Sequence, residues 1–241
     1  MEPKGLTLER LRFEILESIN MYSDDSTITY RLLDQWIQEY RVKWIELEFN
    51  KFNRIVPMAY YQNLNCLELE AVDIAECCST LVGCEILRTK REIPSLVSLT
   101  DGELIAKVSP VGVYAIPFQL IKYENLEWFG NGRYEKKRVG TFYYNNRMYF
   151  YCKDKFTYSM IEKVSLRAVF RYPKEVGEFT DCSNQPCWGP NSQFPLDEKM
   201  WSYIKKDILV NELNIKLATP EDNTLDNAKT GFPIRQDEGN K

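Results

Sequence analysis

The sequence predicts an α+β protein in which helices from both ends of the chain form a bundle and a β-rich region is inserted between them. Apolar residues recur at helical spacing in the N-terminal part and again near the C-terminal end, whereas the middle shows short apolar runs broken by turn residues. The expected parts are an N-terminal helical hairpin in 1–60, a β-rich domain in 61–175, a loop and a C-terminal helix that packs on the hairpin in 176–218, and an extended tail in 219–241.

The first helix of the hairpin is expected to be short and amphipathic. Thr7 is placed to cap it, because a threonine hydroxyl accepts hydrogen bonds from backbone N–H groups of a first helical turn. The apolar positions recur at helical spacing and comprise Leu8, Leu11, Ile15 and Ile19. The pattern ends near Asn20, before a turn-like segment, which predicts a second helix packed alongside the first.

That second helix is predicted to be long and to cover residues 22–53. Its cap and first turn can draw on the side-chain oxygens of Asp24, Asp25 and Ser26. Large apolar side chains follow at four-residue spacing, namely Leu32, Trp36, Tyr40 and Trp44, with Leu33, Ile37 and Ile45 beside them. A face this broad requires neighbours on several sides, so we expect Trp36 and Trp44 to be largely buried within the bundle or between subunits. The candidate subunit-interface residues are Trp36, Tyr40, Trp44 and, from the last helix, Trp201.

The β-rich region is predicted from short apolar runs that are separated by turn residues. The expected strands are Cys66–Val72, Cys84–Arg88, Leu96–Leu99, Leu104–Val108, Thr141–Asn145, Arg147–Cys152 and Val164–Phe170. Asn145 and Asn146 indicate a tight hairpin, because asparagine tolerates the positive φ that such turns need. Residues 117–129, in contrast, are predicted to form a helix with Pro117 in its first turn.

The C-terminal part is expected to contain an irregular loop in 177–195 and then a helix in 197–217. The apolar side of this helix comprises Met200, Ile204, Ile208 and Leu213, with Trp201 beside them. Beyond Thr219 the chain is polar and rich in turn residues, so the tail is expected to become ordered only on a partner.

The charge pattern argues against tight binding of nucleic acid. The chain has 31 basic and 35 acidic residues, whereas proteins that grip phosphates usually carry a basic excess. One basic cluster stands out: Arg133, Lys136, Lys137 and Arg138. It is a candidate contact for DNA phosphates or for an acidic partner protein, and a solvated loop is the simpler alternative.

The sequence offers little for catalysis. It contains no histidine, which excludes histidine-based catalytic triads, Cys-His dyads and the common histidine zinc motifs. Gly130-Asn131-Gly132 resembles the start of a dinucleotide-binding loop but lacks the third glycine, so a turn is the preferred interpretation. We therefore predict no catalytic, cofactor-binding or metal-binding residues. The apolar runs are also too short for a membrane span or a signal peptide, so the protein is expected to stay in the cytoplasm in which it is made.

The cysteines are expected to be free. Seven are present, an odd number, and they are scattered without a CxxC pair: Cys66, Cys77, Cys78, Cys84, Cys152, Cys182 and Cys187. In a reducing compartment such residues usually behave as small apolar side chains, so we predict neither a disulfide nor a thiolate metal site.

Several segments together are characteristic of one protein family. They are 23–26 with the long helix that follows, 67–70, 83–89, 130–134 and 168–170. In combination they resemble the head-to-tail connector ring proteins of short-tailed bacteriophages, in particular those of crAss-like phages that infect gut Bacteroides. The resemblance extends over most of residues 6–228.

The resemblance implies a structural role in the virion neck or tail. Members of that family assemble in about a dozen copies into rings stacked beneath the portal, which extend the DNA channel into the tail. The implied partners are other copies of the chain, the portal protein, other tail or ring proteins, and genomic DNA that passes without sequence-specific binding. Two alternatives remain from the residues alone: an adaptor that binds a host protein, and an enzyme that acts through cysteine or carboxylate side chains.

Overall fold

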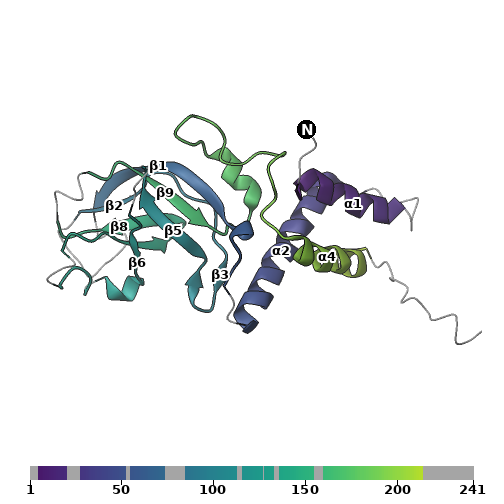
Figure 1. Ribbon diagram of the computed structural model, residues 1–241, viewed down its shortest axis with the longest axis horizontal. Coiled ribbons are helices and arrows are strands. Elements are labelled where there is room, and N and C mark those ends of the chain that lie inside the picture. The colour runs from purple at the N-terminus through teal and green to yellow at the C-terminus, as the bar shows by residue number, and fades with distance from the viewer. Residues whose placement is uncertain are drawn as a thin grey trace, which may run out of the picture.

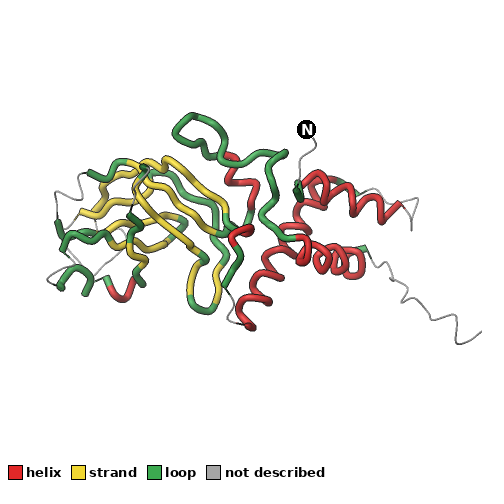
Figure 2. Tube along the Cα trace, in the orientation of Figure 1, coloured by secondary structure: helices red, strands yellow, loops and turns green. Residues whose placement is uncertain are grey.

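The computed structural model describes residues 5–20, 28–52, 55–73, 85–112, 116–126, 128–132, 136–154 and 160–213. Within these residues the molecule is elongated, with a curled sheet at one end and three helices, α1, α2 and α4, at the other (Figure 1). Figure 2 shows the same separation, with strands in yellow on one side and most of the helices in red on the other. The prediction of a mixed helical and β-strand protein is confirmed.

Helix α1 (Leu8–Asn20) forms as predicted. The Thr7 hydroxyl accepts a hydrogen bond from the Arg10 backbone N–H at 3.3 Å, which supplies the expected cap. The predicted apolar side chains are all buried: Leu8, Leu11, Ile15 and Ile19. They pack into a helical core that also includes side chains of α2 and α4.

Helix α2 (Tyr30–Phe52) begins later than the sequence predicts. Ile28 and Thr29 are not helical, so the start predicted at residues 24–26 is wrong; residues 21–27 themselves lie outside the described part. Thr29 takes the capping role, because its hydroxyl accepts from the Leu32 N–H at 3.4 Å. The centre of the buried face also differs, since it consists of Leu33, Ile37, Arg41 and Ile45, all fully buried. The predicted tryptophans lie beside this stripe.

Helix α4 (Glu198–Asp207) returns to the first two helices and continues as a π-helical turn, η5 (Ile208–Glu212). The Asp197 carboxylate caps it by accepting from the Met200 N–H at 2.7 Å. The buried side chains of α4 and η5 are Met200, Trp201, Ile204, Ile208 and Leu209, which complete the helical core. The predicted extension of this helix beyond residue 213 lies outside the described residues.

The sheet has seven strands in the order β5-β9-β1-β2-β8-β7-β6. Their bounds are β1 (Gln62–Asp73), β2 (Glu85–Thr89), β5 (Ile105–Pro110), β6 (Gln119–Leu120), β7 (Gly140–Tyr144), β8 (Arg147–Tyr151) and β9 (Lys163–Ala168). All neighbours are antiparallel except β6 and β7. A separate small hairpin pairs β3 (Ser98–Leu99) with β4 (Gly102–Glu103). The predicted Asn145-Asn146 turn joins β7 and β8, with φ values of 46° and 55°.

Strand β1 connects the two halves of the sheet. Its first half pairs with β9 and its second half with β2. An irregularity between Leu64 and Leu67 interrupts the pairing with β9, and Cys66 adopts a positive φ of 57° there. At the opposite side, the Phe118 N–H donates to the Val108 carbonyl at 2.7 Å, which brings the β5 and β6 edges together. The sheet therefore curls around an apolar interior that includes Phe150.

The helix predicted in 117–129 is wrong. The N–H groups of Gln119 and Ile121 donate to the carbonyls of Val139 and Thr141, so this segment pairs with β7 as a short edge strand. It then forms the 3₁₀ turn η3 (Tyr123–Asn125), and Leu126 packs onto the outer face of the sheet. Strand pairing with a distant segment overrides the local helical pattern here. Pro117 does not tell the two outcomes apart, because proline is tolerated both in the first turn of a helix and at the start of an edge strand.

The prediction that all cysteines are free is also wrong. Cys66 and Cys182 form a disulfide, with their Cα atoms 5.3 Å apart. The two residues are separated by 116 positions, so no local pattern reveals that the β1 irregularity faces the loop that follows η4 (Pro173–Glu178). Cys152 and Cys187 are free and half-buried. Cys77, Cys78 and Cys84 lie outside the described residues.

Candidate subunit interface

Two of the four aromatic residues predicted at a subunit interface are buried inside the subunit. Trp201 is only 5% exposed, and its indole Nε1 donates to Glu14 Oε2 at 2.6 Å, which joins α4 to α1. Tyr40 is buried to a similar degree, and its hydroxyl donates to Glu212 Oε1 at 2.8 Å. Burial, assisted by this hydrogen bond, raises the pKa of Tyr40, so the phenol remains a donor at neutral pH.

The other two aromatic residues, Trp36 and Trp44, are half-buried against the helical core. Trp44 stacks on Tyr203 with ring centroids 5.1 Å apart, and its Nε1 donates to Asp207 Oδ2 at 3.0 Å. All four predicted residues thus contact the helices of their own subunit. Trp36 and Trp44 still expose part of their surface, and a role between subunits remains a prediction.

A buried arginine joins the helices to the sheet. Arg41 is 0% exposed, and its guanidinium donates to three carbonyl oxygens: Pro195 and Phe170, both at 2.8 Å, and Tyr60 at 3.3 Å. These carbonyls belong to the loop before α4, the chain just after β9, and the 3₁₀ turn η1 (Met58–Tyr60). Burial lowers the pKa of Arg41 to about 9. The sequence interpretation missed this residue, although its four-residue spacing from Ile37 and Ile45 was the available signal.

A second polar junction centres on Asp34, which is buried on α2. Its two carboxylate oxygens accept from Arg12 of α1, at 2.5 Å from Nε and 2.6 Å from Nη2. The ammonium group of Lys174 in η4 contacts the same carboxylate. Burial and the neighbouring Arg12 lower the pKa of Lys174. Asp34 and Arg41 together fix how the helices sit against the sheet side of the molecule.

A groove of about 460 Å³ lies between the C-terminal end of α2, η1 and the start of α4. Its apolar lining includes Trp44, Phe49, Ile55, Tyr60, Met200 and Tyr203. We call it the α2–α4 groove. Ile55 at its edge is 94% exposed, the highest value among the large apolar side chains that the structure describes. An exposed apolar side chain beside a concave apolar lining is typical of a contact site for protein.

A second apolar patch lies at the opposite end of α2. It comprises Phe13, Tyr30 and Leu32, all exposed. Arg12 of α1 lies over the Tyr30 ring, with its guanidinium carbon 5.5 Å from the ring centroid. The 23 residues of α2 span about 34 Å at 1.5 Å per residue, which separates this patch from the α2–α4 groove.

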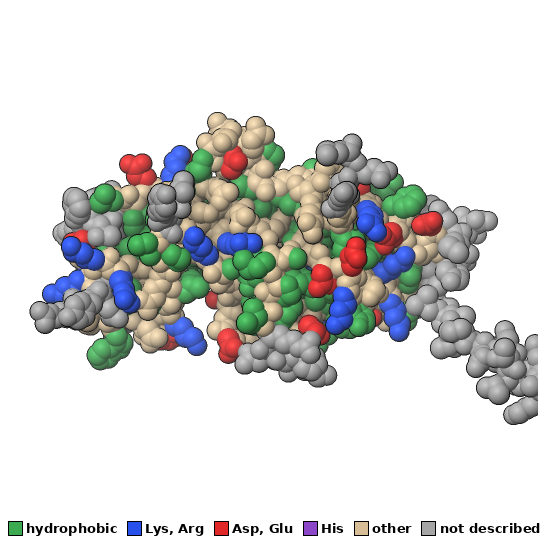
Figure 3. All heavy atoms as spheres, in the orientation of Figure 1, with side chains coloured by type: hydrophobic (Ala, Val, Ile, Leu, Met, Phe, Trp, Pro, Cys, Tyr) green, Lys and Arg blue, Asp and Glu red, His purple; other side chains and the backbone are tan. Residues whose placement is uncertain are grey.

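The predicted basic cluster lies near the β6–β7 edge of the sheet. Lys136, Lys137 and Arg138 are exposed just before β7, whereas Arg133 is outside the described residues. Exposed aromatic side chains accompany them: Trp128, which is 74% exposed, and Tyr123, which stacks on Tyr144. In Figure 3, blue basic side chains gather around this sheet end of the molecule, with few red acidic ones among them. The arrangement forms an exposed surface with both apolar and basic groups.

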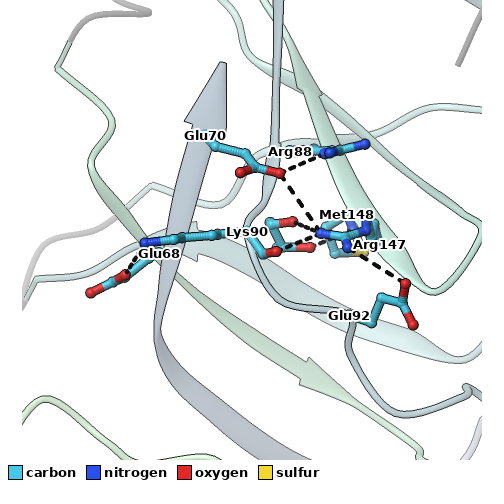
Figure 4. A network of polar contacts seen from close by, with 8 residues as sticks. Glu68, Glu70, Arg88, Lys90, Glu92, Arg147 and Met148 are labelled. Atoms are coloured by element: carbon cyan, nitrogen blue, oxygen red, sulfur yellow. Dashed lines mark hydrogen bonds and ion pairs between the residues drawn. The ribbon is translucent and has the colours of Figure 1, made fainter. Parts of the chain in front are cut away.

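A charged network crosses the outer side of β1, β2 and β8 (Figure 4). Glu70 lies 2.8 Å from Arg88 and 3.8 Å from Arg147, and Arg147 also donates to the carbonyls of Thr89 and Lys90. Lys90 pairs with Glu68 and Arg147 with Glu92, so the network has three acidic and three basic side chains, and the Arg147 guanidinium satisfies carbonyls where β2 ends. This network holds strands together. Among the described residues, no group of three or more Cys, Asp or Glu side chains is arranged to hold a metal ion.

The comparison with known families defines the class to which this mixed fold belongs, namely the structural proteins of the bacteriophage tail. The chain belongs to the phage tail ring protein 2 family, which matches residues 13–238. It is 22% identical over 237 residues to ring protein 2 of Bacteroides phage crAss001, covering 95% of this chain and 99% of that protein. The predicted resemblance to crAss-like ring proteins is confirmed, and a structural role in a tail ring is supported. None of the helices in the described ranges is long and apolar enough to span a bilayer.

Proposed function

We propose that this protein is a structural subunit of a ring in the portal-tail assembly, where about a dozen copies surround the DNA channel below the portal. The observation that carries the proposal is the match to a tail ring family over nearly the whole chain. Homo-oligomerisation, the portal as a neighbour, and passage of DNA during ejection are parts of the proposal.

The helical end is the part that we assign to contacts within the ring. A ring closes through a head-to-tail interface, so each subunit needs two different surfaces that fit each other. The α2–α4 groove and the patch around Tyr30 lie at opposite ends of α2 and carry exposed apolar side chains. Trp36 and Trp44 add apolar surface along the same helix. We therefore infer a bundle with an inserted β-rich domain that projects from the ring, in the domain division 1–60, 61–175, 176–218 and 219–241.

The sheet end is the part that we assign to the outer wall or to a contact with the next ring or tail protein. Lys136, Lys137 and Arg138, with Arg133 close in sequence, suit an acidic protein surface. A cluster this small neutralises few phosphates, and binding through few phosphates weakens steeply as salt rises. The net charge of −4 is also compatible with a channel through which DNA passes without being held.

The alternative of a cysteine enzyme lacks a supporting observation in the described residues. Burial raises the pKa of the Cys152 and Cys187 thiols, which lowers the thiolate fraction that nucleophilic chemistry requires. The buried carboxylate of Asp34 serves a salt bridge, and that of Asp197 in the α2–α4 groove serves a helix cap.

Electron microscopy of the purified virion tests the proposal directly. We expect the chain to occupy a closed ring in the tail, with α2 at the contact between neighbours. The proposal would be contradicted if the tail contained only one copy of this chain, or none. Light scattering of the purified chain is a supporting measurement, with the tail partners added because ring subunits can stay monomeric without them.

A further inference from the structure

Helices α2 and α4 run antiparallel, which places the end of the described chain opposite the groove. Glu212 of η5 accepts a hydrogen bond from Tyr40, and Asp207 of α4 accepts one from Trp44, which lies one turn further along α2. The later residue of α2 thus lies beside the earlier residue of the α4–η5 segment, so the two run in opposite directions. The chain therefore leaves η5 toward the N-terminal end of α2, whereas the α2–α4 groove lies at its C-terminal end.

The α2–α4 groove has a lining that suits an apolar segment followed by a cation. Its walls are mostly aromatic and aliphatic, and its charged groups are two carboxylates, Glu48 and Asp197, and one ammonium, Lys199. The described part of the same chain leaves the apolar lining open at one side, where Ile55 projects. A ligand with two large apolar side chains and one positive charge would match both the lining and the excess of carboxylates.

The sequence contains such a segment within its polar tail. Residues 231–235 read Gly-Phe-Pro-Ile-Arg, and Phe232 is the largest apolar side chain between 219 and 241. Pro233 fixes its own φ and disfavours a helical conformation for Phe232, so the segment is biased toward an extended form. We propose that residues 231–235 of one subunit fill the α2–α4 groove of the next subunit in the ring.

The neighbouring copy is the occupant that the direction of the chain favours, and this step rests on the proposed ring function. In the ring proposed above, the end of α2 that carries Tyr30 in one subunit lies beside the groove end of α2 in the next, so a tail that leaves η5 toward the Tyr30 end reaches the neighbour's groove. The 17 residues of 214–230 reach up to about 60 Å when extended, which is enough to cross such a contact. Binding to its own groove would instead require the chain to turn back along α4.

The first experiment uses a fluorescent peptide of residues 229–237 titrated with the full chain. We expect saturable binding that weakens at least tenfold for a peptide with Phe232→Ala, and at least tenfold for a chain with Ile55→Asp. Because Ile55 is almost fully exposed, its substitution should leave the fold intact, which circular dichroism checks. Ile116→Asp is the matched control, since Ile116 is also exposed but belongs to the sheet end, and it should bind as the wild type does. Equal binding by the wild type and Ile55→Asp overturns the proposal.

The second experiment separates the neighbour's groove from the subunit's own. Full-length chain carrying the photo-cross-linker p-benzoylphenylalanine at position 232 is prepared in ¹⁴N and ¹⁵N forms, mixed, assembled with its tail partners and irradiated. We expect position 232 of one chain to cross-link to Met200, or to a neighbouring groove residue, of a chain with the other isotope label. Adducts found only within one chain, or only outside the groove, overturn it. The peptide titration needs no ring. Failure of the peptide to bind therefore contradicts the groove proposal alone, whereas absence of the chain from tails contradicts the proposed ring function.

Discussion

The helical region and the sheet are held together by different kinds of contact. In the sheet, backbone pairing joins neighbouring strands around the apolar interior, and the β7–β8 hairpin closes over only two residues. In the helical region, the third helix is joined to the first two by side-chain hydrogen bonds between residues 163 to 187 positions apart. Backbone pairing survives many changes of side chain, whereas each bond in the helical region depends on one particular residue. Single substitutions should therefore be most damaging at the helical end and at its junction with the sheet.

The largest expected effect is that of Arg41→Met. Removing the guanidinium leaves three buried carbonyls without their donors, so we expect a loss of about 3–5 kcal/mol in the free energy of unfolding. Urea unfolding followed by tryptophan fluorescence measures it. Arg31→Met on the exposed side of α2 is the control and should change stability by less than about 0.5 kcal/mol. A loss below 1 kcal/mol at Arg41 would show that the two regions are joined mainly by apolar packing.

The disulfide comes next, because it strengthens the sheet side. Cys66→Ser should lower the free energy of unfolding by about 2–4 kcal/mol, since the bond closes a loop of more than a hundred residues in the unfolded chain. Reduction with dithiothreitol should produce the same loss in the wild type and no further loss in the variant. Cys152→Ser serves as the control. Titration of denatured, unreduced protein should detect at least two thiols fewer than the seven cysteines of the sequence, and seven thiols would refute the bond.

Deleting residues 220–241 should separate folding from assembly. Few large apolar side chains occur in this segment, so we expect the free energy of unfolding of the monomer to change by less than about 1 kcal/mol. Assembly with tail partners, measured by sedimentation, should weaken clearly. A large fall in the thermal stability of the monomer would mean that the tail belongs to the core of its own subunit.

The smallest effect on stability is expected for the double substitution Lys136→Glu and Lys137→Glu at the sheet end. Both side chains are exposed, so unfolding should shift by no more than about 0.5 kcal/mol. Attachment of partner proteins should weaken more than retention of DNA in the virion. Lys107→Glu with Lys163→Glu, two exposed lysines on β5 and β9, provides an equal change of net charge. Submicromolar DNA binding at physiological salt, abolished only by the first pair, would instead identify a surface that grips DNA.

Local patterns predicted the elements whose determinants are close in sequence. The apolar spacing of α1, the Asn145-Asn146 hairpin and the Asp197 start of α4 all depend on residues within a few positions of one another. The errors arose where a distant partner decided the outcome. Residues 117–129 became an edge strand because β7 was available for pairing, and Cys66 found Cys182 across 116 positions.

The candidate site was predictable only in part for the same reason. Tyr40, Trp44 and Trp201 hydrogen-bond to residues of their own subunit, and the predicted role of these aromatic residues between subunits stays a prediction. Arg41 was missed because an arginine on a helix usually lies in solvent, and its three carbonyl acceptors come from other parts of the chain. The groove beside Ile55 has no sequence signature, since three separate segments form it.

The separation of α2 from α4 along the chain also sets the order of events during synthesis. Nearly 150 residues lie between the two helices, and a ribosome that adds about 5–20 residues per second needs roughly 7–30 s to make them. During that interval Leu33, Ile37 and Ile45 lack the partners that α4 supplies. The side of the groove that α4 forms does not yet exist. A growing chain therefore cannot present the groove to another subunit. The groove exists only once α4 has been made, so ring building through this surface starts after that point.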